Sequence, residues 1–383
     1  MPTLRLQNVG QLRDAEIGFG DLTVLVGPQA TGKSIALQFT KLLVDTGYVQ
    51  NELKRYGLDW SRKLSEFLEV YLGEGMSSIW RANGRGSKVF WNKRAADLLA
   101  VAARTRKRKP ERLFFIPAQR VLTLRDGWPR PFTDYSAGDP FSVRDFSEKL
   151  RVLMESEFSG EGNLFPRERR LKNAYRILLE RDVFSKFALT IDKSSRQKRL
   201  VLGRRGKPLP YMVWSAGQRE FVPLLLGLYW LMPATKIARR EALEWVVIEE
   251  IEMGLHPQAI SIALLLVMEL LSRQYRVCLS THSPQVLEFI WALNRIQKEG
   301  GATRHIFDLF DLPHELRGQL HSVAELALHK KLRVYYFERS TGRTHDISDL
   351  DPASPDWLEA GWGGLSEFSQ HANEVVARVV AES

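Results

Sequence analysis

A run of residues near the N-terminus has the types and the spacing of a phosphate-binding loop: Gly27, Pro28, Gln29, Ala30, Thr31, Gly32, Lys33 and Ser34. Glycines at both ends allow the backbone to turn its N–H groups toward phosphate oxygens. Lys33 supplies a cation for the outer phosphates, and Ser34 supplies a hydroxyl for Mg²⁺. The pattern predicts a site for the phosphates of a nucleotide, with a glycine turn that holds no ligand as the alternative.

Two adjacent glutamates, Glu249 and Glu250, directly follow the apolar run at residues 245–248. Hydrolysis of a nucleoside triphosphate needs one carboxylate to hold Mg²⁺ and another to orient the attacking water. Neighbouring side chains of a strand face opposite sides, but the chain leaves the sheet where the strand ends, so both carboxylates can reach the phosphates. We assign Glu249 to Mg²⁺ and Glu250 to the water. Two glutamates in a solvated loop are the alternative.

The elements that must position these residues are readable from apolar periodicity. Residues 22–26 are an apolar run, and residues 34–44 have helical spacing, so we expect a strand, the loop and a helix in that order. This order aims the positive end of the helix dipole at the phosphates. Strands and helices alternate again from residue 245 to residue 281, which indicates parallel pairing. The sequence predicts an α/β fold with a mixed, largely parallel sheet flanked by helices.

Three further regions complete the predicted organisation. Strands at residues 4–9 and 15–19, and a hairpin through 79–81 and 89–91 with Gly84 and Gly86 at its turn, predict an antiparallel β lobe. Residues 64–72 have helical spacing. Two blocks of helical spacing, separated by Gly160 and Gly162, predict a helical insertion at residues 141–187. The last region, residues 300–383, shows a strand at 332–337 and a closing amphipathic helix, and we expect a C-terminal α/β extension.

Composition narrows the classes of protein. The 383 residues suffice for one large domain or two of ordinary size. A single cysteine, Cys278, excludes a disulfide framework and suits a reducing cytoplasm. It lies in an apolar run, so we expect it to be buried. The apolar stretches are too short to span a bilayer and no leader is evident, so we expect a soluble, cytoplasmic protein with no membrane partner.

Basic residues exceed acidic ones by ten and gather at residues 104–109 and 193–207. Such runs predict a polyanionic partner, for example double-stranded DNA. Solvated surface is the equal alternative, because aromatic residues do not interleave with either run.

In chain order, five stretches resemble the motifs of ABC-class ATPases, and within them the soluble AAA-like group that includes OLD-family, RecF-like and SMC-like proteins. Residues 27–34 resemble the Walker A motif, and Gln119 resembles the glutamine that joins the core to the helical region and contacts Mg²⁺. Glu249 and Glu250 resemble Walker B, with Glu250 as the catalytic carboxylate, and His282 resembles the switch histidine at the γ-phosphate. The signature motif is resembled by Ser215, Ala216, Gly217 and Gln218.

The resemblance implies a single P-loop, ABC-class ATPase domain over residues 1–383 that uses ATP and Mg²⁺ and releases ADP and phosphate. It implies a homodimer that sandwiches two ATP molecules, because in the family the signature serine and glycine complete the nucleotide site of the second subunit. The segments at 251–257 and 280–284 resemble the prokaryotic defence-type branch. We therefore expect a conformational switch in anti-phage defence that acts through a separate effector protein.

Some residues depart from the family or fit a simpler role. Glu249 stands where many relatives have aspartate, and Ala216 where glycine is common. Ser215 also fits an ordinary helix N-cap, and His282 fits a histidine satisfied at the end of a strand. Arg120 fits a contact to phosphate or to a second subunit, or else a surface salt bridge. His256, beside Pro257, fits a structural or dimer-loop role, and Phe19 fits packing in the core.

The main alternative function is a RecF-like DNA-repair ATPase that binds duplex DNA through the basic runs. An OLD-type nuclease would need an Asp-x-Asp motif behind a buried strand. The Asp-x-Asp at residues 349–351 lies in a polar run, so we expect a loop there and no nuclease. A transporter motor and an SMC-like protein with long arms fit less well, since the chain lacks an obvious adenine-stacking aromatic and any long heptad array.

Overall fold

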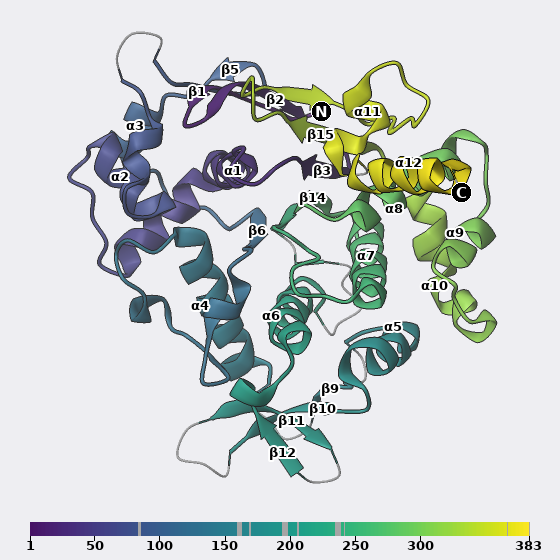
Figure 1. The fold of residues 1–383 in the computed structure, drawn as a ribbon. Helices are drawn as coiled ribbons and strands as arrows, with labels where there is room; N and C mark the ends of the chain where they lie inside the picture. Colours follow the sequence, from purple (N-terminus) through teal and green to yellow (C-terminus); the bar gives the residue numbers. More distant parts are fainter. Residues whose placement is uncertain are drawn as a thin grey trace.

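The computed structural model describes residues 1–82, 86–158, 163–167, 170–193, 198–204, 207–233, 239–240, 242–365 and 367–382. Helices flank a central sheet on both sides, and a small antiparallel sheet closes one end of the molecule (Figure 1). The strands are β1 (Thr3–Val9), β2 (Leu12–Gly18), β3 (Leu22–Val26), β4 (Lys88–Trp91), β5 (Arg94–Ala95), β6 (Leu113–Ile116), β7 (Leu124–Arg125), β8 (Trp128–Pro129), β9 (Asn163–Phe165), β10 (Ala188–Asp192), β11 (Arg199–Arg204), β12 (Lys207–Pro210), β13 (Trp245–Ile248), β14 (Arg276–Thr281), β15 (Leu332–Phe337) and β16 (Thr344–Asp346).

The helices include one long helix, α1, that begins in the phosphate loop. They are α1 (Lys33–Arg55), α2 (Leu64–Leu72), α3 (Leu98–Ala103), α4 (Phe141–Ser156), α5 (Asn173–Leu179), α6 (Ala216–Leu231), α7 (Pro257–Ser272), α8 (Pro284–Lys298), α9 (Thr303–Leu309), α10 (His314–Ala327), α11 (Trp357–Ala360) and α12 (Glu367–Glu382), with short 3₁₀ turns η2 (Arg120–Thr123) and η5 (Tyr211–Val213). None of the helices in the described ranges combines the length and the apolar character needed to cross a bilayer.

The central sheet has the strand order β16–β15–β3–β14–β13–β6. β16 runs antiparallel to β15, and all the other neighbours are parallel. The carboxyl ends of β3, β6, β13 and β14 therefore lie at one edge of the sheet, where α/β proteins bind their ligands. The phosphate loop, Gln119, the two glutamates and His282 follow these four strands in turn. The predicted α/β fold class is confirmed.

Alternate residues of the sheet strands enter two separate hydrophobic cores, as the two-residue period of a strand requires. Val24 and Val246 pack into the core formed with α4, α6 and α7. Leu25 and Val247 pack into the core formed with α1 and the antiparallel sheet β2–β1–β4–β5. Cys278 is fully buried in this second core, as its apolar surroundings predicted. The central sheet is covered on both faces, and this packing fixes the positions of the loops at its edge.

The structure revises three expectations about organisation. The expected hairpin through residues 79–81 and 89–91 is wrong: β4 pairs with β1 and β5, while Trp80 makes an isolated bridge to Val9. Gly84, placed at the turn of that hairpin, lies outside the described residues. The segment at 141–187 contains the expected helices but also a strand, β9, which pairs with β10. Gly160 and Gly162, expected to separate the two blocks, also lie outside the described residues.

The C-terminal region is joined to the central sheet more closely than an extension would be. Its strand β15, expected at the residues where it is found, pairs in parallel with β3. A Cβ on Gly27 would lie 2.6 Å from the carbonyl oxygen of Phe337, the last residue of β15. The end of β15, in the region at 300–383, therefore packs against the phosphate loop.

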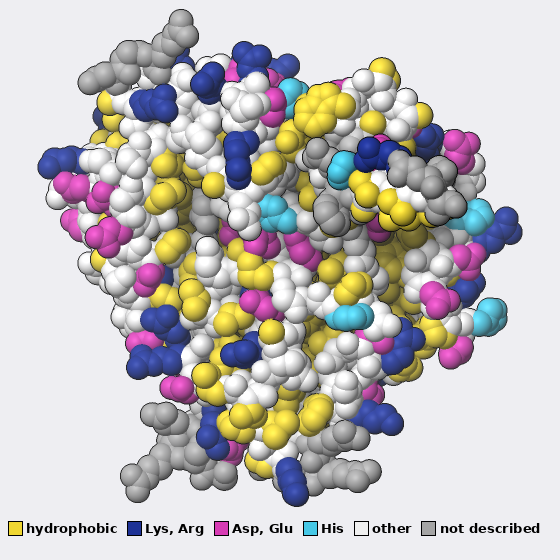
Figure 2. All heavy atoms as spheres, in the orientation of Figure 1, with side chains coloured by type: hydrophobic (Ala, Val, Ile, Leu, Met, Phe, Trp, Pro, Cys, Tyr) yellow, Lys and Arg dark blue, Asp and Glu magenta, His cyan; other side chains and the backbone are white. Residues whose placement is uncertain are grey.

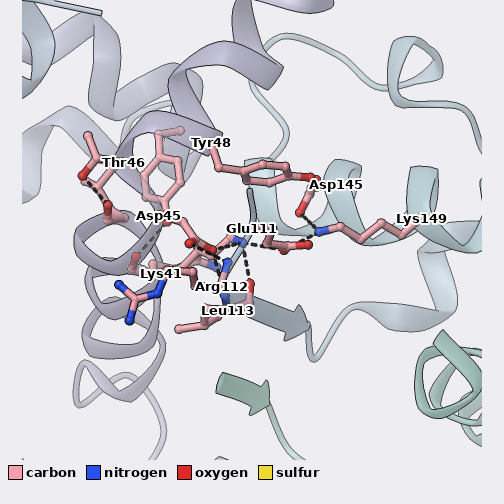
Figure 3. A network of polar contacts seen from close by, with 12 residues as sticks. Lys41, Asp45, Thr46, Tyr48, Glu111, Arg112, Leu113, Asp145 and Lys149 are labelled. Atoms are coloured by element: carbon pink, nitrogen blue, oxygen red, sulfur yellow. Dashed lines mark hydrogen bonds and ion pairs between the residues drawn. The ribbon is translucent and has the colours of Figure 1, made fainter. Parts of the chain in front are cut away.

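A buried polar network holds α1 to α4 and to the start of β6 (Figure 3). Lys41 Nζ lies 2.8 Å from Asp45 Oδ2 and 2.7 Å from Glu111 Oε1, and it also donates to the carbonyl oxygen of Leu113. Lys149 of α4 donates to the same Glu111 oxygen at 2.6 Å. Asp45 interrupts the regular geometry of α1 and accepts hydrogen bonds from the backbone at the start of β6. The helix that carries Lys33 is thus attached to two other elements through charged groups.

Candidate functional site

The loop between β3 and α1 adopts a conformation that requires its two glycines. Gly27 and Gly32 have φ values of +142° and +99°. A Cβ on Gly32 would lie 2.7 Å from the side chain of Leu12, too close for a packed contact. The loop therefore fits closely between the β1–β2 turn and the end of β15. Glycine is needed at both positions because other residues rarely adopt positive φ and could not fit the space.

Lys33 lies in this loop with its side chain folded back over the turn. Its Nζ donates to the carbonyl oxygens of Gly27 at 2.7 Å and Pro28 at 2.8 Å. Burial lowers the pKa of Lys33 to about 8, while the negative charges of Glu250 and Glu252 oppose this change. A phosphate group would favour the charged form of this lysine. The Lys33 ammonium group is therefore suited to bind a phosphate group.

Glu249 lies under the loop and is 2% exposed. Its Oε2 accepts a hydrogen bond from the backbone N–H of Ala118 at 3.2 Å, and the Ser34 hydroxyl also bonds to the carboxylate. Its Oε1 is buried without a hydrogen-bond partner. Burial raises the pKa of Glu249 to about 7. An unpaired buried carboxylate oxygen beside a serine hydroxyl fits the donor set of Mg²⁺, which takes one or two protein oxygens together with phosphate oxygens and water.

Glu250 turns the other way and lines a cavity of about 230 Å³ above the loop. The cavity is lined by Gln11, Gln29, Ala30, Thr31, Gly32, Lys33, Ser34, Ile35, Glu250 and His282. His282 Nε2 lies 3.8 Å from Glu250 Oε1. Burial, and next the charge of Lys33, lowers the pKa of His282, so its imidazole is neutral at pH 7. An ammonium, a hydroxyl, a carboxylate and a neutral imidazole therefore surround one cavity.

Three residues near this cavity were not predicted from the sequence. Glu252 Oε1 accepts a hydrogen bond from the backbone N–H of His282 at 2.5 Å, and its Oε2 is buried without a partner. Arg339, just after β15, donates to the carbonyl oxygen of Gln29 at 2.6 Å. Gln11, from the β1–β2 turn, donates to that of Ala30 at 2.9 Å. Glu252 follows the glutamate pair closely enough to be a candidate, but no local signal marks the other two.

Other predicted site residues do not line the cavity. Gln119 follows β6 at the same edge of the sheet, but its side chain is exposed. Ser215 accepts a hydrogen bond from the N–H of Gln218, whose side chain accepts one from the N–H of Ser215, so the pair forms a capping box at the start of α6. Ser215 and Ala216 are exposed. Gly217 approaches the turn after β13, where a Cβ would lie 3.3 Å from the carbonyl oxygen of Gly254.

Arg120, His256 and Phe19 do not line the cavity. Arg120 is fully buried, so neither a surface salt bridge nor a contact to phosphate or to a second subunit describes it. His256 caps α7 by accepting a weak hydrogen bond from the N–H of Gln258 at 3.4 Å, in agreement with the structural role expected for it. Phe19 packs against Trp91 and Trp245 in the core, as its apolar surroundings predicted.

Within the described ranges, no group of three or more His, Cys, Asp or Glu side chains could hold a metal ion by itself. Asp349 and Asp351 form ion pairs with Lys298 and Arg295. They lie in the loop that the sequence predicted. A cation at the phosphate loop would depend on Ser34, Glu249 and the oxygens of the nucleotide.

A parallel sheet with a glycine loop and lysine after a central strand, and carboxylates after a neighbouring strand, defines a fold of the P-loop NTPase type. A family described as "AAA domain, putative AbiEii toxin, Type IV TA system" matches residues 142–288, less than half of the chain. The matched region extends from α4 into α8 and includes Glu249, Glu250 and His282. Together these findings support a P-loop protein of the AAA-like type. No curated protein matches the sequence.

Solved structures of SMC head domains are also similar. The SMC head bound to the C-winged helix domain of ScpA has 11% sequence identity and a TM-score of 0.39. The SMC head domain from Thermotoga maritima has 13% identity and a TM-score of 0.30. Each alignment covers 75% of this chain and 90% of the other chain. At these scores the likeness carries no argument about activity.

Proposed function

We propose that this chain binds ATP with Mg²⁺ at the β3–α1 loop and hydrolyses it to ADP and phosphate. The observation that carries the proposal is that Lys33, Ser34, Glu250 and His282, which come from three different strand ends, surround a single cavity. Positioning and electrostatic stabilisation supply most of the catalysis in phosphoryl transfer. The four side chains are of the types needed for positioning the phosphates and for stabilising their charge.

Each side chain has a definite part in the proposed reaction. Lys33 binds the outer phosphates, and Ser34 with Glu249 holds Mg²⁺, whose charge would offset that of the phosphate oxygens. Glu250 orients and deprotonates the attacking water, and His282 donates a hydrogen bond to the γ-phosphate. Gln119, exposed after β6, would reach the metal only after a movement of its side chain. The backbone N–H groups of residues 27–34 complete the phosphate contacts.

We further propose that the protein acts as a nucleotide-dependent switch through a homodimer. The capped N-terminus of α6 is exposed, with Ser215, Ala216, Gly217 and Gln218 available to a phosphate group presented by a second copy. Figure 2 shows hydrophobic side chains gathered over η5 and the β11–β12 hairpin, where Met212 is 70% exposed and Val213 is 61% exposed. An apolar surface beside the helix start is suited to a contact between subunits.

The defence role and the separate effector protein remain part of this proposal. They are supported by the resemblance of residues 251–257 and 280–284 to defence-type ATPases, and by the printed description of the matched family, which names a toxin of a toxin–antitoxin system. In this scheme closing and opening of the dimer on ATP and ADP signals to the effector. The switch itself needs no other catalytic activity.

Steady-state ATP turnover of the purified chain tests the proposed reaction. Glu250→Gln should retain ATP binding and lose turnover, because the carboxylate that activates water is replaced by an isosteric amide. Lys33→Ala should lose binding as well. ATP binding without turnover in the wild-type protein, at any protein concentration, would reject hydrolysis, and absence of ATP binding would reject the site.

A second candidate, an ATPase that acts on duplex DNA, is favoured by one observation. The basic run at residues 104–109 is exposed, but its backbone is attached to α1. Buried Gln50 donates to the carbonyl oxygen of Arg104 at 3.1 Å and accepts from the N–H of Arg106 at 2.9 Å. A Cβ on Gly47 would lie 2.6 Å from the carbonyl oxygen of Lys107. The cations are therefore presented on an anchored backbone. Part of the other basic run, at 193–207, lies outside the described residues.

Duplex-DNA affinity measured over a range of salt concentrations tests this candidate. Phosphate contacts release counterions, so affinity should fall steeply with salt. The double variant Arg106→Gln, Lys107→Gln should reduce the slope of log K against log salt by about 2, whereas Lys330→Gln on the other side of the sheet serves as a charge control. Equal slopes for all three proteins would assign the run to solvated surface.

A further inference from the structure

We infer that Arg120 is a positioning residue that couples helix α6 to the turn that carries Glu250. The inference rests on the proposed role of Glu250 in ATP hydrolysis. Arg120 is the first residue of η2, directly after the β6 strand end, and its side chain is fully buried. It lies beneath the cavity and does not line it. Its contacts are therefore with the protein alone.

The guanidinium of Arg120 bonds to two separate elements at once. Nη1 donates to the carbonyl oxygens of Glu249 at 3.0 Å and Glu250 at 3.2 Å. Nη2 donates to those of Glu250 at 3.1 Å and Met253 at 3.4 Å. Nε faces α6, where the carbonyl oxygen and Oε2 of Glu220 each lie 3.3 Å away. All three nitrogens thus have partners, in the planar fork that only arginine offers.

These contacts hold a residue whose backbone conformation is strained. Glu250 has a φ of +44°, a region that residues other than glycine rarely adopt. Its N–H donates to Ser280 Oγ at 3.2 Å, and its carbonyl oxygen receives both Nη1 and Nη2 of Arg120. Strained residues persist where their surroundings hold them. Arg120 therefore determines the direction in which the Glu250 side chain leaves the turn.

Stability is a poor explanation for this arrangement. A buried cation with a single carboxylate partner costs more desolvation than an exposed pair, and burial lowers the pKa of Arg120. Glu220, its ion-pair partner, has a raised pKa for the same reason. A well-packed apolar side chain would fill such a position at similar or lower cost. The benefit of arginine here is geometric, since four carbonyl oxygens accept hydrogen bonds from one rigid donor that also lies within ion-pair distance of the Glu220 carboxylate.

The coupling has a definite direction through the structure. Glu220 lies two residues after Gln218, within the first turns of α6, and Gly217 of the same helix contacts the turn at Gly254. A movement of the exposed start of α6 would therefore shift Glu220, then Arg120, and then the peptide of Glu250. Contact at Ser215 would change the orientation of the catalytic carboxylate without touching it.

Hydrogen exchange of the nucleotide-free protein tests the coupling directly. We compare wild type with Arg120→Lys, Arg120→Met and the matched control Arg144→Met, since Arg144 is also a buried arginine but donates to the carbonyl oxygen of Val70. Both Arg120 variants should exchange about tenfold faster at residues 249–255 and at residues 216–222 together. Faster exchange near residue 120 alone, or equal changes in the Arg144 control, would overturn the inference.

Turnover provides a second test with a different readout. Arg120→Lys should lower kcat at least about tenfold and change KM by less than about twofold, because the nucleotide contacts remain. Arg144→Met should lower Tm but leave both constants unchanged. If Arg120→Met fails to fold, Glu220→Gln is a milder change that weakens the contact between Arg120 and Glu220, and it should lower kcat in the same way. If both Arg120→Lys and Glu220→Gln keep the wild-type kcat, the coupling is wrong. If the wild-type protein itself shows no turnover, the proposed function is rejected, and the hydrogen-exchange comparison alone tests the coupling.

Discussion

Glu250 Oε1 and His282 Nε2 face each other at 3.8 Å across the mouth of the phosphate loop, although one follows β13 and the other follows β14. The two strands are parallel neighbours, so their carboxyl ends deliver both side chains to the same place. Burial and the nearby charge of Lys33 lower the pKa of His282, which leaves the imidazole neutral at pH 7 beside the Glu250 carboxyl group. The pair could hold a water molecule and a phosphate oxygen between its members.

His282→Gln should reduce turnover by about 10- to 100-fold while ATP binding persists. Glutamine can still donate a hydrogen bond but cannot titrate. Because the pKa of His282 is lowered from 6.5, the acid limb that it causes in the wild-type pH profile should lie below pH 6.5 and should be absent from the variant. A pH–rate series of both proteins decides this. Identical acid limbs would show that another group titrates.

Glu249→Gln should stabilise the nucleotide-free protein at pH 8 by about 1–3 kcal/mol. The folded carboxyl keeps its proton up to about pH 7, whereas the unfolded one releases it near 4.5. Folded-state stability contributed by this group is therefore present below pH 4.5 and is lost as pH rises through about 7. Urea unfolding at pH 4.5 and pH 8 measures the difference.

The buried Glu269 is a matched control for this prediction. Burial raises its pKa, but Lys172 and Arg273 outweigh burial and the net pKa is lowered. Glu269→Gln should therefore destabilise the protein at pH 8. A destabilising effect of Glu249→Gln at the same pH would contradict the assignment of an unpaired carboxylate at the loop.

Binding of ATP at pH 8.5 should take up a fraction of a proton. Burial lowers the pKa of Lys33 to about 8 in the free protein, and a bound phosphate would raise it again. Calorimetry in two buffers of different ionisation enthalpy measures the uptake. It should be much smaller at pH 6.5, where the lysine is already charged, and Glu250→Gln should be measured alongside because Glu250 favours the charged lysine.

Ser215→Arg should leave ATP binding nearly unchanged but abolish ATP-driven dimerisation, because a large cation would occupy the place of the incoming phosphate. Sedimentation velocity with ATP, using Glu250→Gln to keep the nucleotide intact, measures the dimer. Ser215→Ala is the control: it loses the same helix cap, at a cost of about 1 kcal/mol, but keeps a small side chain at the helix start. A dimer that persists in Ser215→Arg would leave the residue as an ordinary N-cap.

Lys41→Met should destabilise the protein by about 3–5 kcal/mol, since it leaves the buried Asp45 without its cation and leaves Glu111 with Lys149 alone. Lys63, which pairs with Glu66 at the surface, is the contrast: Lys63→Met should change the free energy of unfolding by less than about 1 kcal/mol. Urea unfolding of the two variants compares the pairs. Similar values would mean that the network in Figure 3 is open to water.

Several elements could be predicted because their signals are local. The helix over Leu64–Leu72 and the strand over Leu332–Phe337 were expected at the residues where they are found. Their apolar periodicity is a property of the side chains within each segment. The hairpin expected through residue 80 was wrong because strand pairing depends on distant segments. β4 pairs with β1, which lies far away in the sequence.

The sequence by itself identified the candidate residues for phosphate chemistry and predicted that they follow apolar strands: glycine spacing, the lysine and the paired glutamates are readable without a fold. Only the tertiary structure decided that β15 lies beside β3, that Arg339 reaches the loop, and that Arg120 is buried between the glutamate turn and α6. Strand order and the burial of a charge depend on which distant segments pack together. The packing of distant segments is determined by the total free energy of the folded chain, so it cannot be read from any short stretch of the sequence.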